Sequence, residues 1–291
     1  MKILILGGAG MLGHQLWMTL GREHQVWVTV RKTPSQFPDY YVFPKKYVRS
    51  GVDALIFDEV TRALASVQPD LVINCIGLIK QNPLVHDPLS SIQLNALLPH
   101  RVSLICRTAG IRMIHISTDC VFSGKKGMYL ETDQSDAEDL YGRTKYLGEL
   151  HYPHTLTLRT SIIGRELSQF KSLLEWFLDQ KGKTVKGYTR VIFSGVTTIY
   201  LANMVREIIN NDIKLTGVYH IASPPISKYE LLCMLRDAYK LDVEIVPDDQ
   251  EGSDRSLVGD KFIKETGYSY PNWADLVTEL ASDPTPYEKW R

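Results

Sequence analysis

Tyr141 and Lys145 stand four residues apart, and their side chains are of the types needed for proton transfer. On a helix, two residues at this spacing lie on one face. A phenol has an ordinary pKa of about 10, so it exchanges protons poorly at neutral pH. An ammonium group one turn away favours the phenolate, so we predict that Lys145 lowers the pKa of Tyr141 and that the pair is catalytic.

Thr118 is the third candidate catalytic residue. It belongs to Ser117-Thr118-Asp119, at the end of a predicted strand over residues 112–117. In open α/β sheets, ligands bind outside the carboxyl ends of the strands. We therefore expect the Thr118 hydroxyl to hydrogen-bond a substrate carbonyl oxygen and the Tyr141 phenol together.

A glycine-rich turn follows the first predicted strand, residues 2–6. Its glycines suit a tight turn, a close approach of the backbone to a pyrophosphate, and close packing of strand on helix. The N-terminus of the following helix offers free N–H groups and a partial positive charge to phosphates. The pattern predicts a dinucleotide-binding turn in which these residues contact the cofactor: Gly7, Gly10, Met11, Leu12 and Gly13.

The second predicted strand, residues 25–30, ends in Arg31 and Lys32 and has no acidic residue there. An acid at this position accepts hydrogen bonds from the ribose of NAD, whereas an arginine suits the 2′-phosphate of NADP. Arg31 therefore favours NADP(H), with NAD(H) possible. The alternative is that Arg31 and Lys32 are solvated loop charges.

Short β-branched runs alternate with amphipathic segments through the first half of the chain, which is typical of a parallel sheet. We predict an α/β fold with a Rossmann-type doubly wound sheet over residues 1–160. Residues 161–291 form mainly a smaller α/β substrate-binding lobe, with some segments returning to the first domain. The expected strands are 2–6, 25–30, 71–76, 112–117 and 155–159, and the expected helices are 11–21, 58–67, 88–109 (kinked or split at Pro99) and 139–151.

The second half is less regular. Ser227 followed by Glu230 is a capping-box pattern that predicts a helix over residues 227–239. Residues 32–50 form an unusually long loop, which lies over a ligand or a partner or is a surface insertion. Further helices are expected at 167–180, 198–210 and 272–283, and a strand at 217–222.

Composition excludes several classes of protein. The chain has 291 residues, 44% apolar and 23% charged, as in globular domains, and 33 basic residues balance 33 acidic ones. Zero net charge argues against a nucleic-acid or anionic-membrane partner, and no apolar run reaches the roughly 18–20 residues of a membrane span. The four cysteines are far apart in the sequence, which favours reduced thiols and a protein of the cytoplasm. The closest pair of histidines, His151 and His154, flanks Pro153 and does not share a helical face, so no metal site is expected.

With these motifs, the chain resembles the extended short-chain dehydrogenase/reductase superfamily and, within it, the dTDP-4-dehydrorhamnose reductase family. The similarity covers most of the chain and is strongest through residue 164. The matching residues are Gly7, Gly10 and Gly13, Val72-Ile73-Asn74-Cys75-Ile76-Gly77, Asn95, Ser117-Thr118-Asp119-Cys120-Val121-Phe122, Tyr141-Gly142-Arg143-Thr144-Lys145, Leu158-Arg159-Thr160-Ser161 and Phe193-Ser194-Gly195-Val196-Thr197-Thr198.

The resemblance implies a role for each matching residue. Thr118 polarises the carbonyl group, Tyr141 is the general acid, and Lys145 binds the nicotinamide ribose. Asp53 contacts the adenine. The remaining residues that it implies at the cofactor are Cys75, Ile76, Gly77, Asn95 and Ser117.

The expected activity is NADPH-dependent reduction of the 4-keto group of a nucleotide-activated 6-deoxy sugar, in the synthesis of surface polysaccharide precursors. Its expected partner is the nucleotide sugar, and a homodimer with a second copy of the chain is an open alternative. Two alternatives remain open: an epimerase or dehydratase with bound NAD, and a non-catalytic NADP-binding regulatory subunit. Candidate substrate contacts are Lys80, Cys120, Arg190 and Arg255, with surface charges or a plain pocket wall as alternatives; family members commonly carry tyrosine in place of Cys120.

Overall fold

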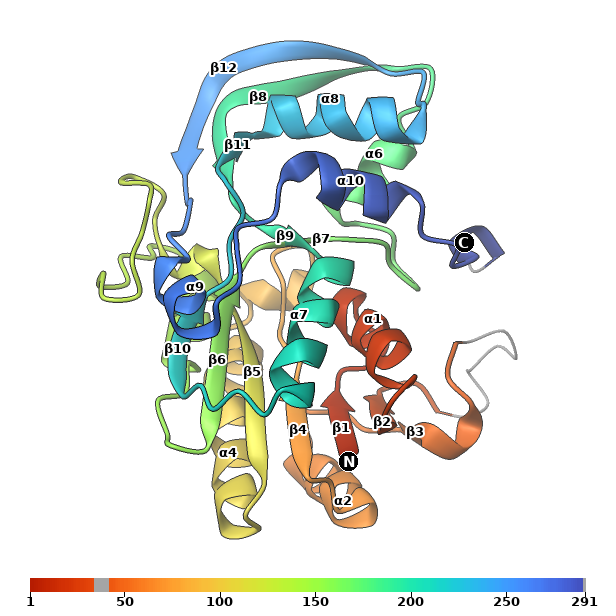
Figure 1. Cartoon of the computed structure of the whole chain (residues 1–291), viewed down its shortest axis with the longest axis vertical. Helices are drawn as coiled ribbons and strands as arrows, with labels where there is room; N and C mark the ends of the chain where they lie inside the picture. Colours follow the sequence, from red (N-terminus) through yellow and green to blue (C-terminus); the bar gives the residue numbers. More distant parts are fainter. Residues whose placement is uncertain (34–41, 290–291) are drawn as a thin grey trace.

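A computed structural model describes residues 1–33 and 42–289 of the chain (Figure 1). Its central sheet has seven parallel strands in the order β10-β6-β5-β4-β1-β2-β3. This arrangement confirms the predicted doubly wound sheet. The strands are β1 (Lys2–Leu6), β2 (Gln25–Val30), β3 (Val48–Ser50), β4 (Leu71–Asn74), β5 (Arg112–Thr118), β6 (Thr155–Thr160) and β10 (Gly217–His220).

Helices cover both faces of this sheet, because alternate side chains of its strands point to opposite sides. In β1, Ile3 and Ile5 belong to the core under helices α1 and α7, whereas Leu4 and Leu6 belong to the core under α2 and α4. Burial on both faces explains why β1 and β4 are largely apolar. The helices are α1 (Met11–Leu20), α2 (Phe57–Val67), α4 (Leu98–Thr108), α5 (Leu140–Leu147) and α7 (Thr198–Asn210).

A second lobe lies over the carboxyl ends of the central strands (Figure 1). It holds a three-stranded sheet in the order β11-β8-β12, packed against α6, α8 and α10. Its elements are α6 (Leu173–Leu178), β8 (Thr184–Phe193), β11 (Ile226–Ser227), α8 (Lys228–Tyr239), β12 (Glu244–Asp254) and α10 (Trp273–Ala281), with the short pair β7 (Ile162–Ile163) and β9 (Val196–Thr197) nearby.

The chain crosses between the lobes more than once. After β8 it returns to pack α7 against α1, and β10 then pairs with β6 at the edge of the central sheet. Helix α9 (Asp260–Thr266) packs beside β10. The division into domains at residue 160 remains a prediction.

The helix predicted over residues 88–109 forms as three segments. They are α3 (Pro88–Ser91), the π-helix η4 (Ile92–Leu97) and α4, whose second residue is Pro99. Proline fits this position because the first turn of a helix needs no N–H donor there. The capping box is confirmed: Ser227 Oγ accepts from Glu230 N at 3.1 Å, and Glu230 Oε2 accepts from Ser227 N at 3.0 Å.

Two other predicted segments differ. The helix predicted over 167–180 is wrong before Leu173, where α6 begins. Gln169 and Phe170 have positive φ, and the Glu166 carboxylate accepts from the backbone N–H groups of Lys171 and Ser172. In the loop over 32–50, residues 45–50 form the 3-10 helix η2 (Lys45–Tyr47) and β3. Residues 34–41 lie outside the described residues. The remaining 3-10 helices are η3 (Pro83–His86), η5 (Asp119–Val121) and η6 (Tyr287–Lys289).

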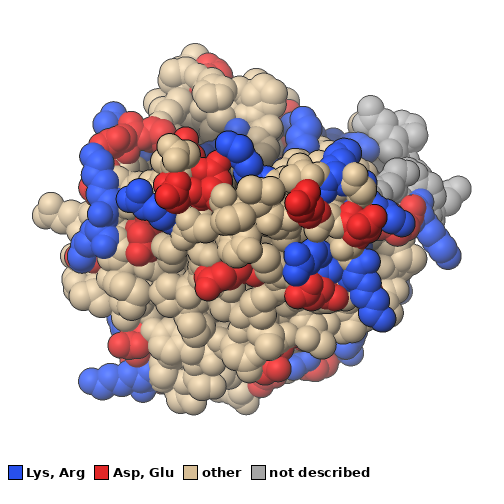
Figure 2. Space-filling view, turned by 90° about the horizontal axis from the view of Figure 1, so that it is seen from above, with Lys and Arg blue, Asp and Glu red and all other residues tan. Residues whose placement is uncertain are grey.

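Within the described ranges, no helix is both long and apolar enough to cross a bilayer. Viewed from above the second lobe, basic and acidic side chains are interspersed (Figure 2). This mixture matches the zero net charge of the sequence.

Candidate active site

The glycine turn between β1 and α1 is built for close packing. Gly7 has φ +86°, a conformation that favours glycine. A Cβ on Gly13 would lie 2.2 Å from Gly7 O, and one on Gly8 would lie 2.3 Å from Val28 Cβ. Gly8 is therefore a requirement of the turn that the sequence analysis did not single out.

Gly10 differs, because a Cβ there would have only Gly7 O nearby, at 3.3 Å. This side of the turn is open to another molecule. The first backbone N–H groups of α1, those of Met11, Leu12 and Gly13, have no acceptor within the helix. The turn thus combines free donors with access, which fits a bound pyrophosphate.

The two residues expected near the adenosine end lie on neighbouring strands. Arg31 is exposed directly after β2. Asp53 lies just past β3, because Val52 N donates to Val30 O, and its Oδ1 accepts from Leu55 N at 3.0 Å. Both lie at the carboxyl edge of the sheet, as a dinucleotide across the crevice requires.

Cys75, Ile76 and Gly77 follow β4; the first two pack against the glycine turn, and a Cβ on Gly77 would lie 3.7 Å from Lys145 Nζ. Cys75 N donates to Leu6 O at 3.0 Å, and Ile76 Cγ1 would lie 3.0 Å from a Cβ on Gly7. Burial raises the pKa of the Cys75 thiol to about 12, so this residue is a neutral wall of the site.

Asn95 and Ser117 were expected at the cofactor, and the structure directs both side chains to protein groups. Asn95 Oδ1 accepts from Leu78 N at 2.8 Å, and its Nδ2 donates to Leu78 O and Thr144 Oγ1. Ser117 Oγ donates to Glu149 Oε1 at 2.6 Å. These side chains therefore hold the loop after β4 and helix α5 in place.

The candidate catalytic residues are brought together at the end of β5. Thr118 is 7% exposed; its hydroxyl donates to Asp119 Oδ1 and accepts from Cys120 N, both at 3.1 Å, and it acts on the Tyr141 phenol by lowering its pKa. Lys145 Nζ donates to Ile116 O at 2.7 Å. Helix α5 begins at the N-cap Asp139, and a Cβ on Gly142 would lie 2.2 Å from Cys120 O, so the helix sits directly against the Thr118 turn.

The pKa of Tyr141 is raised, so the prediction that Lys145 lowers it is wrong for this structure. Burial is the main cause, the neighbouring Cys120 acts in the same direction, and Thr118 acts in the opposite one. Burial lowers the pKa of Lys145 itself to about 8, and its ammonium is engaged with a backbone carbonyl. Tyr141 is therefore a protonated phenol, the form that can donate a proton.

Three of the four predicted substrate contacts surround this group. Lys80 Nζ lies 5.6 Å from the centre of the Tyr141 ring and 2.7 Å from Asp139 Oδ2. Arg255 donates to the carbonyls of Phe122 and Ser123 at 2.9 and 3.0 Å. Cys120 is half-buried, and burial raises its pKa to about 12, which fits a pocket wall rather than a nucleophile.

Arg190 lies apart, exposed on β8 beside Gly252. Lys228, which the sequence analysis missed, lies at the first position of α8 with its Nζ 3.8 Å from the centre of the Phe193 ring. Burial lowers its pKa to about 8 against the opposing charges of Asp119 and Cys120. A lysine directly after an N-cap is ordinarily solvent-exposed, so the sequence does not indicate that Lys228 is buried; the packing of the second lobe buries it.

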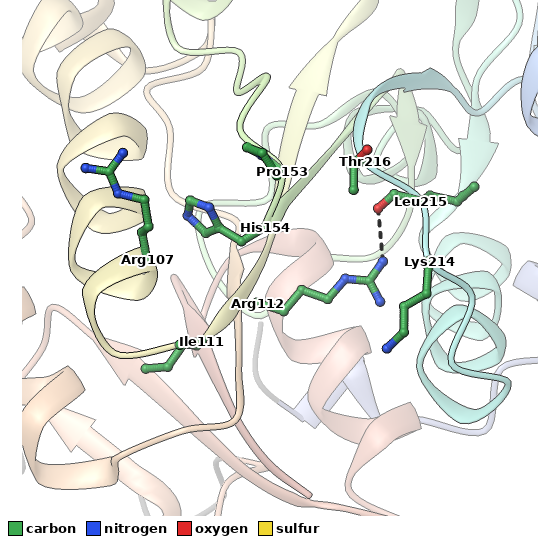
Figure 3. Close-up of a pocket in the computed structure, with 9 residues that line it drawn as sticks. Arg107, Ile111, Arg112, Pro153, His154, Lys214, Leu215 and Thr216 are labelled. Carbon is green, nitrogen blue, oxygen red and sulfur yellow. Dashed lines mark hydrogen bonds between the residues drawn. The ribbon is translucent and has the colours of Figure 1, made fainter.

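A cavity of about 340 Å³ lies at the opposite, amino-terminal edge of the sheet (Figure 3). There the Arg112 guanidinium points toward Leu215 and donates to its carbonyl at 3.0 Å. This hollow is separate from the Thr118 group at the other end of β5. Its lining is Arg107, Gly110, Ile111, Arg112, Pro153, His154, Lys214, Leu215 and Thr216. In the part of the chain that the structure describes, no three His, Cys, Asp or Glu residues are grouped as metal ligands.

Comparison with known proteins shows long, distant similarities. The chain is 24% identical over 296 residues to the spore coat polysaccharide biosynthesis protein SpsK of Bacillus subtilis, covering 97% of both chains. It is 25% identical over 253 residues to methionine adenosyltransferase 2 subunit beta of Danio rerio, covering 82% of this chain and 74% of that one.

A solved structure shares the fold. The dTDP-4-dehydrorhamnose reductase of Bacillus anthracis, in complex with NADP, superposes with a TM-score of 0.78 at 21% identity, over 96% of this chain and 98% of that one. The family model described as the RmlD substrate binding domain matches residues 1–258. The family resemblance is thereby confirmed: the chain belongs to the RmlD substrate binding domain family.

Proposed function

We propose that this protein is an NADPH-dependent reductase of the 4-keto group of a nucleotide-activated 6-deoxy sugar. The observation that carries the proposal is the grouping of Thr118, Tyr141 and Lys145 at the carboxyl edge of the sheet, beside the glycine turn. The NADP complex of the Bacillus anthracis relative supports the choice of cofactor.

The chain's own residues supply the proton and the charge stabilisation. A reduced nicotinamide cofactor, held through its pyrophosphate at the glycine turn, would supply the hydride. Tyr141 donates its phenolic proton to the oxygen of the former keto group, and the Thr118 hydroxyl hydrogen-bonds the same oxygen. The raised pKa of Tyr141 keeps it protonated for this direction of the reaction.

The substrate side of the site is cationic. Lys80, from the loop after β4, and Arg255, directly after β12, both act on Cys120, and Lys228 of α8 acts on Asp119 and Cys120. Cations at this position suit a nucleotide diphosphate. We propose Lys80, Cys120, Arg255 and Lys228 as its contacts, and Arg190 as a more distant one.

The test is to follow the absorbance of NADPH with a dTDP- or UDP-linked 4-keto-6-deoxyhexose. Oxidation that depends on both sugar and protein supports the proposal, and no oxidation with either sugar contradicts it. The similarity to methionine adenosyltransferase 2 subunit beta favours a second candidate, a non-catalytic regulatory subunit. Binding of NADPH without turnover, together with co-purification of another enzyme, would support that candidate.

We expect Arg31→Ala to raise KM for NADPH by about ten- to a hundredfold, because a hydrogen bond to a charged group contributes about 1.5–3 kcal/mol. KM for NADH stays unchanged, since NADH has no 2′-phosphate. Steady-state kinetics with both cofactors measure this. Arg22, exposed after α1 at the far edge of the sheet, is the matched control. Equal effects of Arg31→Ala on both cofactors would contradict the assignment of Arg31 to the phosphate.

For the setting of the reaction, we propose surface polysaccharide precursor synthesis in the cytoplasm. The similarity to a spore coat polysaccharide protein supports the pathway. All four cysteines are free thiols, as a reducing compartment allows. A homodimer remains a prediction, which light scattering on the purified chain would test.

A further inference from the structure

Three polar side chains lie in one row across the sheet beneath α5. Strand register pairs Arg159 of β6 with Ser117 of β5 on one side and with His220 of β10 on the other. All three are buried. Side chains of paired residues on neighbouring strands share one face, so the row forms a continuous polar strip.

Glu149, just past the end of α5, is the acid that completes this row. It is 4% exposed. Its Oε1 accepts from Ser117 Oγ at 2.6 Å and from Arg159 Nε at 2.8 Å, and its Oε2 accepts from Arg159 Nη2 at 2.5 Å. The carboxylate is therefore held on both oxygens, which fixes its position and its charge.

Arg159 determines which ring nitrogen of His220 carries the proton. Arg159 Nη1 lies 2.9 Å from His220 Nε2, and an arginine can only donate. His220 therefore carries its proton on Nδ1, which donates to Val258 O at 3.1 Å. Burial, followed by the charge of Arg159, lowers the pKa of His220 to about 3, so it adds no charge.

Lys145 lies one turn before Glu149 and faces several titratable groups. These are Cys75 after β4, His115 on β5 and Glu149 just past α5, and Tyr141 lies one turn before Lys145 on α5. Burial keeps the pKa of His115 well below its usual value and raises those of Cys75 and Tyr141, so all three are neutral. Among the described residues, Glu149 is the charged partner that acts on Lys145.

We infer that Glu149, locked by Arg159 and Ser117, is a positioning residue that keeps Lys145 in its ammonium form beside Tyr141. The inference rests on the proposed function, in which Lys145 serves Tyr141 and the cofactor. In this inference the buried row has a function besides stabilising the fold: Ser117 and Arg159 hold the Glu149 carboxylate at a fixed place beneath α5.

The sign of the expected effect follows from the charges. Glu149 raises the pKa of Lys145 while burial lowers it, and the result is about 8. Glu149→Gln removes the opposing charge and leaves Arg159 uncompensated nearby. Both changes disfavour the ammonium, so Lys145 loses its proton at a pH lower by about one unit or more.

The experiment measures the titration of Lys145 directly in the full chain. Lysine labelled with ¹³C at Cε reports each ammonium by NMR, and Lys145→Arg identifies its resonance. The same preparations give kcat against pH with NADPH. Because removing one partner of a buried ion pair is strongly destabilising, the double variant Glu149→Gln/Arg159→Gln is measured as well. It removes both charges and keeps the proposal testable where the single variant does not fold.

Glu175→Gln is the matched control. It breaks a second buried pair, in which Arg165 Nε lies 2.8 Å from Glu175 Oε1 in the second lobe. It is expected to lose stability without moving the Lys145 titration or the alkaline limb of kcat.

A downward shift of both readouts in the Glu149 variants, absent in the control, supports the inference. An unchanged Lys145 titration in the single variant, or in the double variant where only that one folds, overturns it. A shifted titration in a protein that reduces no keto sugar supports the charge coupling and contradicts the proposed function instead.

Discussion

Replacing Tyr141 with phenylalanine is expected to lower kcat for keto-sugar reduction by about 10²- to 10⁴-fold. The phenol is the candidate proton donor beside Thr118, and its raised pKa keeps it protonated. Phenylalanine fills the same space, so the fold and the affinity for NADPH are retained. Stopped-flow absorbance of NADPH measures the rate, and cofactor fluorescence measures binding.

Tyr146→Phe is the control for this experiment, because Tyr146 lies on the same helix with its side chain exposed. Its kcat should stay within about twofold, as surface changes leave stability nearly unaltered. A Tyr141→Phe variant as active as the wild type would remove the proposed general acid. Loss of activity in both variants would point to damage to α5 rather than to lost chemistry.

Gly13→Ala is expected to have the second largest effect, on stability and cofactor binding together. The new methyl group would lie 2.2 Å from Gly7 O and 2.9 Å from Gly8 Cα, both backbone atoms that cannot rotate away. Overpacking of this kind costs about 3 kcal/mol, which lowers Tm by several degrees. NADPH affinity falls because the strand and helix that form the turn must separate. Thermal unfolding and a binding titration measure the two effects.

Gly10→Ala separates the two effects. Its methyl group would have only one neighbour, at 3.3 Å, so Tm should change little. It would project toward the open side of the turn and should still weaken NADPH binding. A normal NADPH affinity in Gly10→Ala would contradict the placement of the pyrophosphate at this turn.

Much of the fold could be predicted because its strands are buried on both faces. The strand expected over residues 2–6 is β1, and the helix expected over residues 198–210 is α7. Each is bounded by a clear local signal, the glycine turn after β1 and the cap at Thr197 before α7. Where local and tertiary forces agree, the periodicity alone locates the element.

The second lobe was less accessible because its strands break these rules. β12 contains Pro247, several acids and a bulge between Asp248 and Gly252. It lies at the edge of its sheet, where proline and charges are tolerated, so the composition favours a loop while pairing with β8 makes a strand. Such pairing between distant segments has no signature in a single sequence.

The site divides in the same way. Tyr141 and Lys145 could be found because their spacing is local. The Glu149–Arg159 pair and Lys228 were missed, since strand register and lobe packing bring their partners together. The pKa of Tyr141 was predicted in the wrong direction because a helical spacing shows the neighbouring charge but not the loss of solvent around the phenol.

The place of β10 in the central sheet has a consequence for how the chain is made. β6 is buried along its whole length and ends at residue 160, yet its outer neighbour β10 begins at residue 217. By then all of β8 and helix α7 have been synthesised. Until then a newly made chain carries a strand edge with unpaired backbone N–H and C=O groups on its largest sheet, of the kind that favours association between chains. A chain truncated after residue 160 is therefore expected to aggregate rather than to fold as an independent cofactor-binding domain.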